Sequence, residues 1–91
     1  MSAKDVCSSG WRGVHSSTVT LKNPTSGPVT VSADSSCTWP FPKEKKSGFT
    51  INAGGTHDVV LADDPTQSYC YRTTGCPGDP LKVNPKTVII T

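Results

Sequence analysis

Proline and glycine interrupt this chain so often that no helix of three turns can form. Eight glycines and eight prolines are spread through 91 residues, and both residue types destabilise the interior of a helix. Between these interruptions the β-branched residues cluster in short runs, which suit a pleated and half-buried surface. The clearest runs are residues 18–21, 29–31 and 87–90. The sequence therefore predicts an all-β chain.

Apolar and polar residues alternate in most of these runs, as they do in strands with one buried face. After an irregular or short-strand entry over the first sixteen residues, strands are predicted at 17–22, 28–33, 48–52, 56–62, 67–73 and 86–91. The turn residues 23–27 favour a hairpin between the first two of these strands, and Gly54 with Gly55 favours another between the next two. The apolar run at 88–90 indicates a central last strand, buried on both faces. About seven short strands separated by turns are typical of a small antiparallel β-sandwich.

The whole chain, residues 1–91, is expected to form a single domain. Only 33% of its residues are hydrophobic, so the core is thin and covalent stabilisation would help it. Cys7, Cys37, Cys70 and Cys76 supply an even number of cysteines, which favours two disulfides. The short spacing from Cys70 to Cys76 favours a bridge across a hairpin end, which pairs Cys7 with Cys37. Four cysteines allow three pairings, and the sequence does not choose among them.

The cysteine content also bears on the compartment. Two disulfides in a short chain rich in Ser, Thr and Gly are typical of an oxidising environment, which is extracellular or periplasmic. In that case an export signal has been removed and Met1 was supplied for expression. A cytoplasmic chain that begins natively at Met1 is the competing interpretation.

Charge and hydropathy argue against two classes of partner. The formal net charge is only +2 and the charged residues are spread along the chain, whereas binding to nucleic acid needs a concentrated basic face. No apolar stretch approaches the roughly 20 residues of a membrane-spanning helix, so no membrane insertion is expected. The one local charge cluster, residues 43–46, is interpreted as a solvated loop.

Three kinds of reactive or metal site are disfavoured by the pattern. No Cys-x2-Cys pair is present for zinc, although Cys37, His57, Cys70 and Cys76 would supply ligands if they met in space. The loop carboxylates Asp63, Asp64 and Asp79 match no calcium-loop spacing and suit turns better. His57 and Asp58 are neighbours on a strand and so point to opposite faces, which prevents Asp58 from orienting the imidazole. We therefore expect no enzymatic activity, no metal and no cofactor.

The second half of the chain carries a resemblance to a known family. "FTINAGGTHDVVL", a Tyr-x-Tyr strand, a loop with Cys and Gly, and a final "TVIIT" strand together make residues 49–91 similar to the end of a cupredoxin-like β-sandwich. Blue-copper members of that family place a histidine and usually a methionine in the loop before the last strand. Here that loop reads "TTGCPGDPLKVNPK" and contains neither residue. The resemblance thus implies the scaffold without the copper site.

Aromatic residues and loop lysines are the best candidates for function. Large side chains with polar tips suit both protein interfaces and sugar-stacking platforms. For most of the aromatics, core packing is the favoured alternative, because so small a domain has few other large residues to fill its centre, whereas Trp39 on a proline-flanked edge is expected to be partly exposed. The predicted interaction surface consists of Trp39, Phe41, Lys43, Lys45, Lys46 and Tyr71, with contacts from the loops at 39–46 and 73–80. The favoured function is a non-enzymatic, disulfide-stapled binding module for a protein or carbohydrate. A structural protein that oligomerises through a sheet edge is the alternative and a metal-binding redox protein the third, so monomer and homo-oligomer both stay open.

Overall fold

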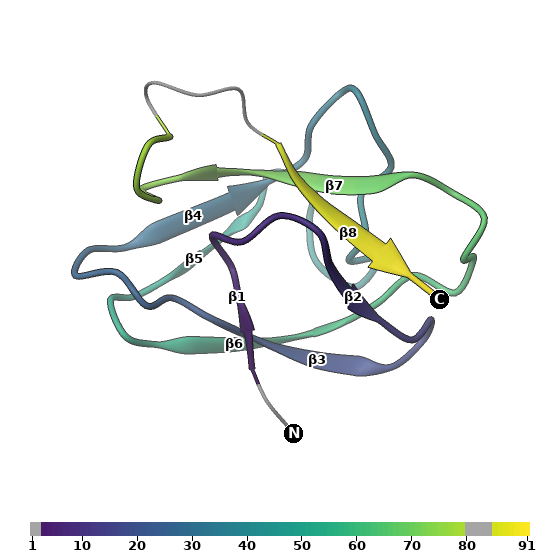
Figure 1. Ribbon diagram of the computed structural model, residues 1–91, viewed down its shortest axis with the longest axis horizontal. Coiled ribbons are helices and arrows are strands. Elements are labelled where there is room, and N and C mark those ends of the chain that lie inside the picture. Colours follow the sequence, from purple (N-terminus) through teal and green to yellow (C-terminus); the bar gives the residue numbers. More distant parts are fainter. Residues whose placement is uncertain (1–2, 80–84) are drawn as a thin grey trace.

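The computed structural model describes residues 3–79 and 85–91, which form eight strands and no helix (Figure 1). The strands are β1 Lys4–Asp5, β2 Trp11–Gly13, β3 Thr18–Lys22, β4 Val29–Ser32, β5 Phe49–Ile51, β6 Thr56–Val60, β7 Tyr69–Thr74 and β8 Lys86–Ile90. This confirms the all-β prediction, including the short-strand entry. No helix in the described ranges is long and apolar enough to cross a membrane.

The strands form two sheets of unequal size. The smaller has the order β1-β3-β6 and the larger the order β2-β8-β7-β4-β5. Most neighbours are antiparallel, as predicted, but β1 pairs with β3 in parallel and β2 pairs with β8 in parallel. The N-terminal segment therefore contributes one short edge strand to each sheet, which alternation within the sequence does not indicate.

Both predicted hairpins are wrong, although the strands and turns exist. β3 and β4 lie in different sheets, and so do β5 and β6. Each turn is an arch that carries the chain from one sheet to the other. A local turn signal specifies that the chain reverses but not whether the two arms pair, and here both arms bury their apolar faces across the sandwich instead.

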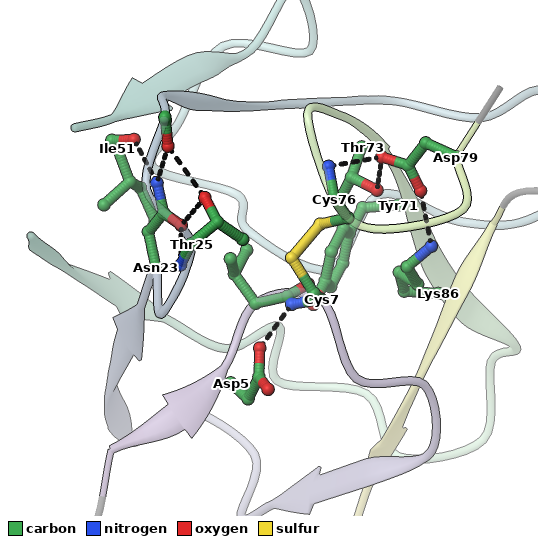
Figure 2. Close-up of a disulfide and its surroundings, with 12 residues drawn as sticks. Asp5, Cys7, Asn23, Thr25, Ile51, Tyr71, Thr73, Cys76, Asp79 and Lys86 are labelled. Carbon is green, nitrogen blue, oxygen red and sulfur yellow. Dashed lines mark hydrogen bonds and ion pairs between the residues drawn. A yellow bond between two sulfur atoms is a disulfide. The ribbon is translucent and has the colours of Figure 1, made fainter. Parts of the chain in front are cut away.

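Asn23 holds one of these arches in place. Its side chain is fully buried, and its Nδ2 donates hydrogen bonds to the carbonyl oxygens of Gly27 at 2.8 Å and Ile51 at 2.9 Å (Figure 2). Its Oδ1 accepts from the backbone amide of Thr25 at 2.9 Å. A single amide thus links the turn after β3 to the end of β5, and it leaves none of its own polar atoms unsatisfied.

The core lies between the sheets and is filled by the alternating residues that the sequence identifies. Val19 and Leu21 of β3 and Val29 and Val31 of β4 are all buried. An aromatic cluster completes the core around Phe41, with Trp39, Phe49, Tyr71 and Trp11 among its neighbours. With so few large residues, the domain uses nearly all of its aromatic side chains for packing.

The last strand has the predicted position but not the predicted burial. β8 lies between β2 and β7 within the larger sheet. Val88 and Ile90 are buried, whereas Ile89 is 37% exposed. The outer face of this sheet is not covered at Ile89, so three consecutive apolar residues do not mean burial on both faces.

Two disulfides are present, and their pairing differs from the favoured prediction. Cys7 pairs with Cys76 and Cys37 pairs with Cys70, with Cα–Cα separations of 5.6 and 5.7 Å. Cys70 lies inside β7 rather than at its end, so it faces the segment after β4, where the Cys70 amide donates to the Thr38 carbonyl at 3.3 Å. The loop after β7 instead brings Cys76 to Cys7, next to β1 (Figure 2). The short sequence spacing between Cys70 and Cys76 was misleading, because disulfides form between cysteines that lie close together in the folded chain.

Candidate interaction site

The three aromatic members of the predicted interaction surface are buried. Phe41 and Tyr71 are fully enclosed, and Trp39 is only 8% exposed, so the expectation of a partly exposed Trp39 is wrong. The Tyr71 hydroxyl donates to the Val6 carbonyl at 2.7 Å and accepts from Trp11 Nε1 at 2.9 Å. Burial raises the pKa of Tyr71 well above its usual value. These side chains complete the core, and the cause is the scarcity of other large residues to fill it.

The three lysines of the predicted surface lie where the sequence indicates. Lys43, Lys45 and Lys46 are exposed in the loop between Pro42 and Gly48. The base of this loop is fixed, because Trp39 Nε1 donates to the Glu44 carbonyl at 3.0 Å. Without the neighbouring aromatics, the lysines form a solvated loop on a rigid base and not a mixed aromatic and basic platform.

His57 and Asp58 take part in separate contacts. His57 Nε2 lies 3.1 Å from Glu44 Oε1, and its ring stacks on Phe49 with centroids 4.3 Å apart. Asp58 accepts a hydrogen bond from Thr20 Oγ1 at 2.6 Å. As the strand periodicity predicts, Asp58 does not orient the imidazole.

The loop aspartates are not brought together. Asp64 accepts from Thr66 and Gln67 near the start of β7, whereas Asp79 binds residues at the far end of that strand. The four sulfur atoms are paired in disulfides and none is free. The sulfurs of Cys37 and Cys70 lie near the Asp34 carboxylate, but that carboxylate is bound by Arg72 at 2.9 Å, and disulfide sulfurs are not the thiolates that zinc prefers.

A groove that the sequence did not indicate runs between one edge of each sheet, and we call it the edge groove. It has a volume of about 450 Å³, within the range of roughly 300–1,000 Å³ that is common for ligand sites. β2 and β3 form its walls, and β1 closes one end. Its lining residues are Lys4, Arg12, Gly13, Val14, Ser17, Thr18, Val19 and Thr20.

One wall of the edge groove is the partly unpaired edge of β3. Within the described residues, β1 is two residues long and pairs with Leu21 and Lys22. Toward the other neighbour, β6, the Ser17 carbonyl accepts from Leu61 and the Asn23 amide donates to Gly55, each at 2.9 Å. Along an antiparallel strand, successive residues direct their backbone amide and carbonyl groups to opposite sides of the strand. The amide and carbonyl of Thr18 therefore face the groove, beyond the reach of β1.

The opposite wall is the edge of the larger sheet at β2. Thr91 donates to the Gly13 carbonyl at 2.9 Å, and His15 donates to the Thr91 carbonyl at the same distance. These hydrogen bonds show that the backbone of Gly13 faces β8. Because successive residues of a strand direct their amide and carbonyl groups to opposite sides, the backbone groups of Arg12 face the groove. A Cβ atom on Gly13 would lie 2.5 Å from Leu61 Cδ1. A larger residue at this position would therefore require the Leu61 side chain to move at the floor of the groove.

The charges in the edge groove are of one sign. Within residues 3–79 and 85–91, Lys4 and Arg12 are its only charged lining residues, and neither takes part in an ion pair with another described residue. Val14 adds an apolar contact and is 57% exposed. The groove thus offers backbone hydrogen-bonding groups, two cationic side chains and an apolar patch.

Sequence reasoning missed this site for a physical reason. The apolar pattern locates β3, but it does not show that a parallel strand begins at Lys4, opposite Leu21, and so does not extend to Thr18. An exposed Val14 next to Arg12 was the only local signal, and a single exposed valine is common on any protein surface.

Comparisons with protein-family models, with curated proteins and with solved structures each found no match.

Proposed function

We propose that this protein is a non-enzymatic interaction module of an oxidising compartment, extracellular or periplasmic, and that it binds its partner in the edge groove. The observation that carries this proposal is the groove itself, in which the backbone edges of both sheets face outward next to Lys4 and Arg12. Exposed sheet edges are established sites for added strands, and natural proteins usually cover or blunt them. The two disulfides support the compartment.

The contrast with the other side of the sandwich supports the choice of groove. There the segment before β5 contacts β6, because Glu44 lies against His57 and the Pro40 carbonyl accepts from Ala62 at 3.0 Å. The lysine loop covers that side with its own chain. The second loop named from the sequence, 73–80, extends to residue 80, which lies outside the described residues.

The proposal is tested by titrating the isotope-labelled, oxidised protein with a panel of short ligands while its amide spectrum is followed by NMR. The panel contains acidic, basic and uncharged peptides and acidic and neutral oligosaccharides. We expect at least one class to shift the amide signals of Arg12, Val14 and Thr18. Arg12→Glu should abolish those shifts, whereas the matched charge reversal Lys45→Glu, on the lysine loop, should leave them intact. Shifts confined to other surfaces, or none with any ligand, would overturn the proposal.

A second candidate function, assembly of identical chains through a sheet edge, is favoured by the same unpaired backbone of β3. It predicts a sedimentation coefficient that rises between micromolar and millimolar protein under oxidising conditions. A constant monomeric value over that range excludes it.

A further inference from the structure

We propose that the partner of the edge groove is an acidic segment in extended conformation, which adds to β3 as a further strand. The inference rests on the groove being the binding site and specifies what the groove recognises. It follows from three features: the backbone of Thr18, which pairs with no described residue on the β1 side, the cations Lys4 and Arg12, which form no ion pair with a described residue, and the start of β1 at Lys4, opposite Leu21.

The backbone geometry favours a strand over a compact ligand. The Thr18 amide and carbonyl project from the edge of β3 in the direction in which β1 pairs further along the same strand. The Val6 amide already donates to the Lys22 carbonyl on that side at 2.9 Å. An extended segment placed beside Thr18 would therefore continue a ladder that exists, at the spacing of about 4.8 Å between strands. Main-chain hydrogen bonds of this kind supply affinity in strand addition.

The charges favour acidic side chains on that segment. Lys4 lies at one end of the groove and Arg12 on the opposite wall, and no acidic side chain of the described residues lines the space between them. On β6, Asp58 lies opposite Thr20 and accepts a hydrogen bond from Thr20 Oγ1, and it does not line the groove. Side chains of an added strand alternate in direction, so acidic residues at every second position would face the cations while the others contact Val14.

The same charges disfavour a second copy of this chain. A two-fold interface brings the same surface of two copies together. In such an interface through β3, Lys4 and Arg12 of one copy would therefore face Lys4 and Arg12 of the other. Like charges across an interface oppose association. The net charge of +2 adds to this repulsion and, in turn, assists the approach of an acidic partner.

The test uses the oxidised full chain and three blocked five-residue peptides. The first alternates Glu with Val, and the second replaces each Glu with Lys. The third is the acidic peptide with alternate backbone amides N-methylated, and it is made in two versions, one methylated at the odd-numbered residues and the other at the even-numbered residues. We expect the acidic peptide to bind at least about tenfold more tightly than the basic one, and N-methylation in one register only to weaken binding by about tenfold. The charge reversal Arg12→Glu should remove the preference for the acidic over the basic peptide, because Lys4 then faces a carboxylate, and Lys45→Glu should leave the preference intact.

Amide hydrogen exchange gives an independent readout that requires no variant to fold. The Thr18 amide should exchange rapidly in the free protein and become protected when the acidic peptide binds, while the Val19 amide, directed at β6, should be protected in both states. Slow exchange at Thr18 in the free protein would mean that the edge is already covered, and it would contradict the inference.

The remaining outcomes separate this inference from the proposed function. If uncharged peptides or oligosaccharides shift the groove signals and the acidic peptide does not, the partner chemistry is wrong and the groove remains a binding site. Equal weakening in both N-methylated registers would reject strand addition while leaving acidic recognition in place. If no ligand shifts the groove signals, both proposals fail.

Discussion

Asp79 joins three parts of the chain through one carboxylate. Its side chain is 8% exposed and lies 3.0 Å from the Lys86 ammonium, which is itself 15% exposed. It also accepts from Thr73 Oγ1 at 2.9 Å and from the Cys76 amide at 2.8 Å (Figure 2). Burial by itself would raise the pKa of Asp79, but the hydrogen bonds and the charge of Lys86 outweigh it and hold the pKa below its usual value. The sequence marked Asp79 as a loop carboxylate, and only its neighbours in space explain its role.

This arrangement predicts a loss of stability in acid. Because the pKa of Asp79 is lower in the folded protein than in the unfolded chain, its contribution is present above about pH 4 and is lost as the pH falls through the folded value. Asp79→Asn should lower the free energy of unfolding by about 1–3 kcal/mol at pH 7. The difference from the unchanged protein should shrink toward pH 2. Urea unfolding followed between pH 2 and pH 7 measures both effects.

Asp63→Asn is the matched control, because Asp63 is exposed in the loop after β6. It should change the unfolding free energy by less than about 0.5 kcal/mol at either pH. If Asp79→Asn lowers the free energy of unfolding by the same amount at every pH in this range, the charge of Asp79 is not what stabilises the loop.

The approach of β5 to β4 depends on the glycine that precedes β5. Gly48 has a φ of 103°, and a Cβ atom built on it would lie 1.9 Å from the Val31 carbonyl oxygen. Both observations exclude a larger residue, since L residues rarely adopt this backbone conformation and the blocking atom belongs to the backbone. The sequence predicts that a strand begins at Gly48, but not that this residue lies against the neighbouring strand.

Gly48→Ala should therefore destabilise the protein by about 3 kcal/mol or more. Gly27→Ala is the control: Gly27 lies in the arch after β3, has no positive φ, and would place a Cβ in open space. We expect that control to change the midpoint of thermal unfolding only slightly. Equal losses in the two variants would mean that the fit between β4 and β5 is not specific.

The two disulfides connect segments that are far apart in the sequence. Cys7 and Cys76 are separated by 69 residues, and Cys37 and Cys70 by 33. Bridges that close long loops remove much conformational entropy from the unfolded chain, so each is expected to contribute about 4 kcal/mol. That is a large part of the 5–15 kcal/mol that is typical for a whole domain, as suits a chain whose core is thin.

Removal of the pair Cys7 and Cys76 by substitution with serine should lower the free energy of unfolding by about 4 kcal/mol. Removal of Cys37 and Cys70 should give a loss of similar size. Mass spectrometry of a non-reduced digest tests the pairing directly, and it should link the peptide containing Cys7 to the one containing Cys76. A peptide that carries a bridge between Cys70 and Cys76 would contradict the structure.

The sequence by itself determined the local features of this protein. Its proline and glycine content excluded long helices, and its alternating residues located the strands and their buried faces, as Val19 and Leu21 show in β3. It also indicated disulfides. These features are predictable because the direction of a side chain along a strand, and the position of a turn, depend on a few neighbouring residues.

Only the tertiary structure decided which segments meet. It turned both predicted hairpins into arches between sheets, exchanged the cysteine partners and buried the aromatics that were expected to bind a partner. It also left Thr18 without a described strand beside it on the groove side of β3. Strand partners and bridges depend on how the whole chain buries its apolar faces at once, and the same local pattern is compatible with several such arrangements.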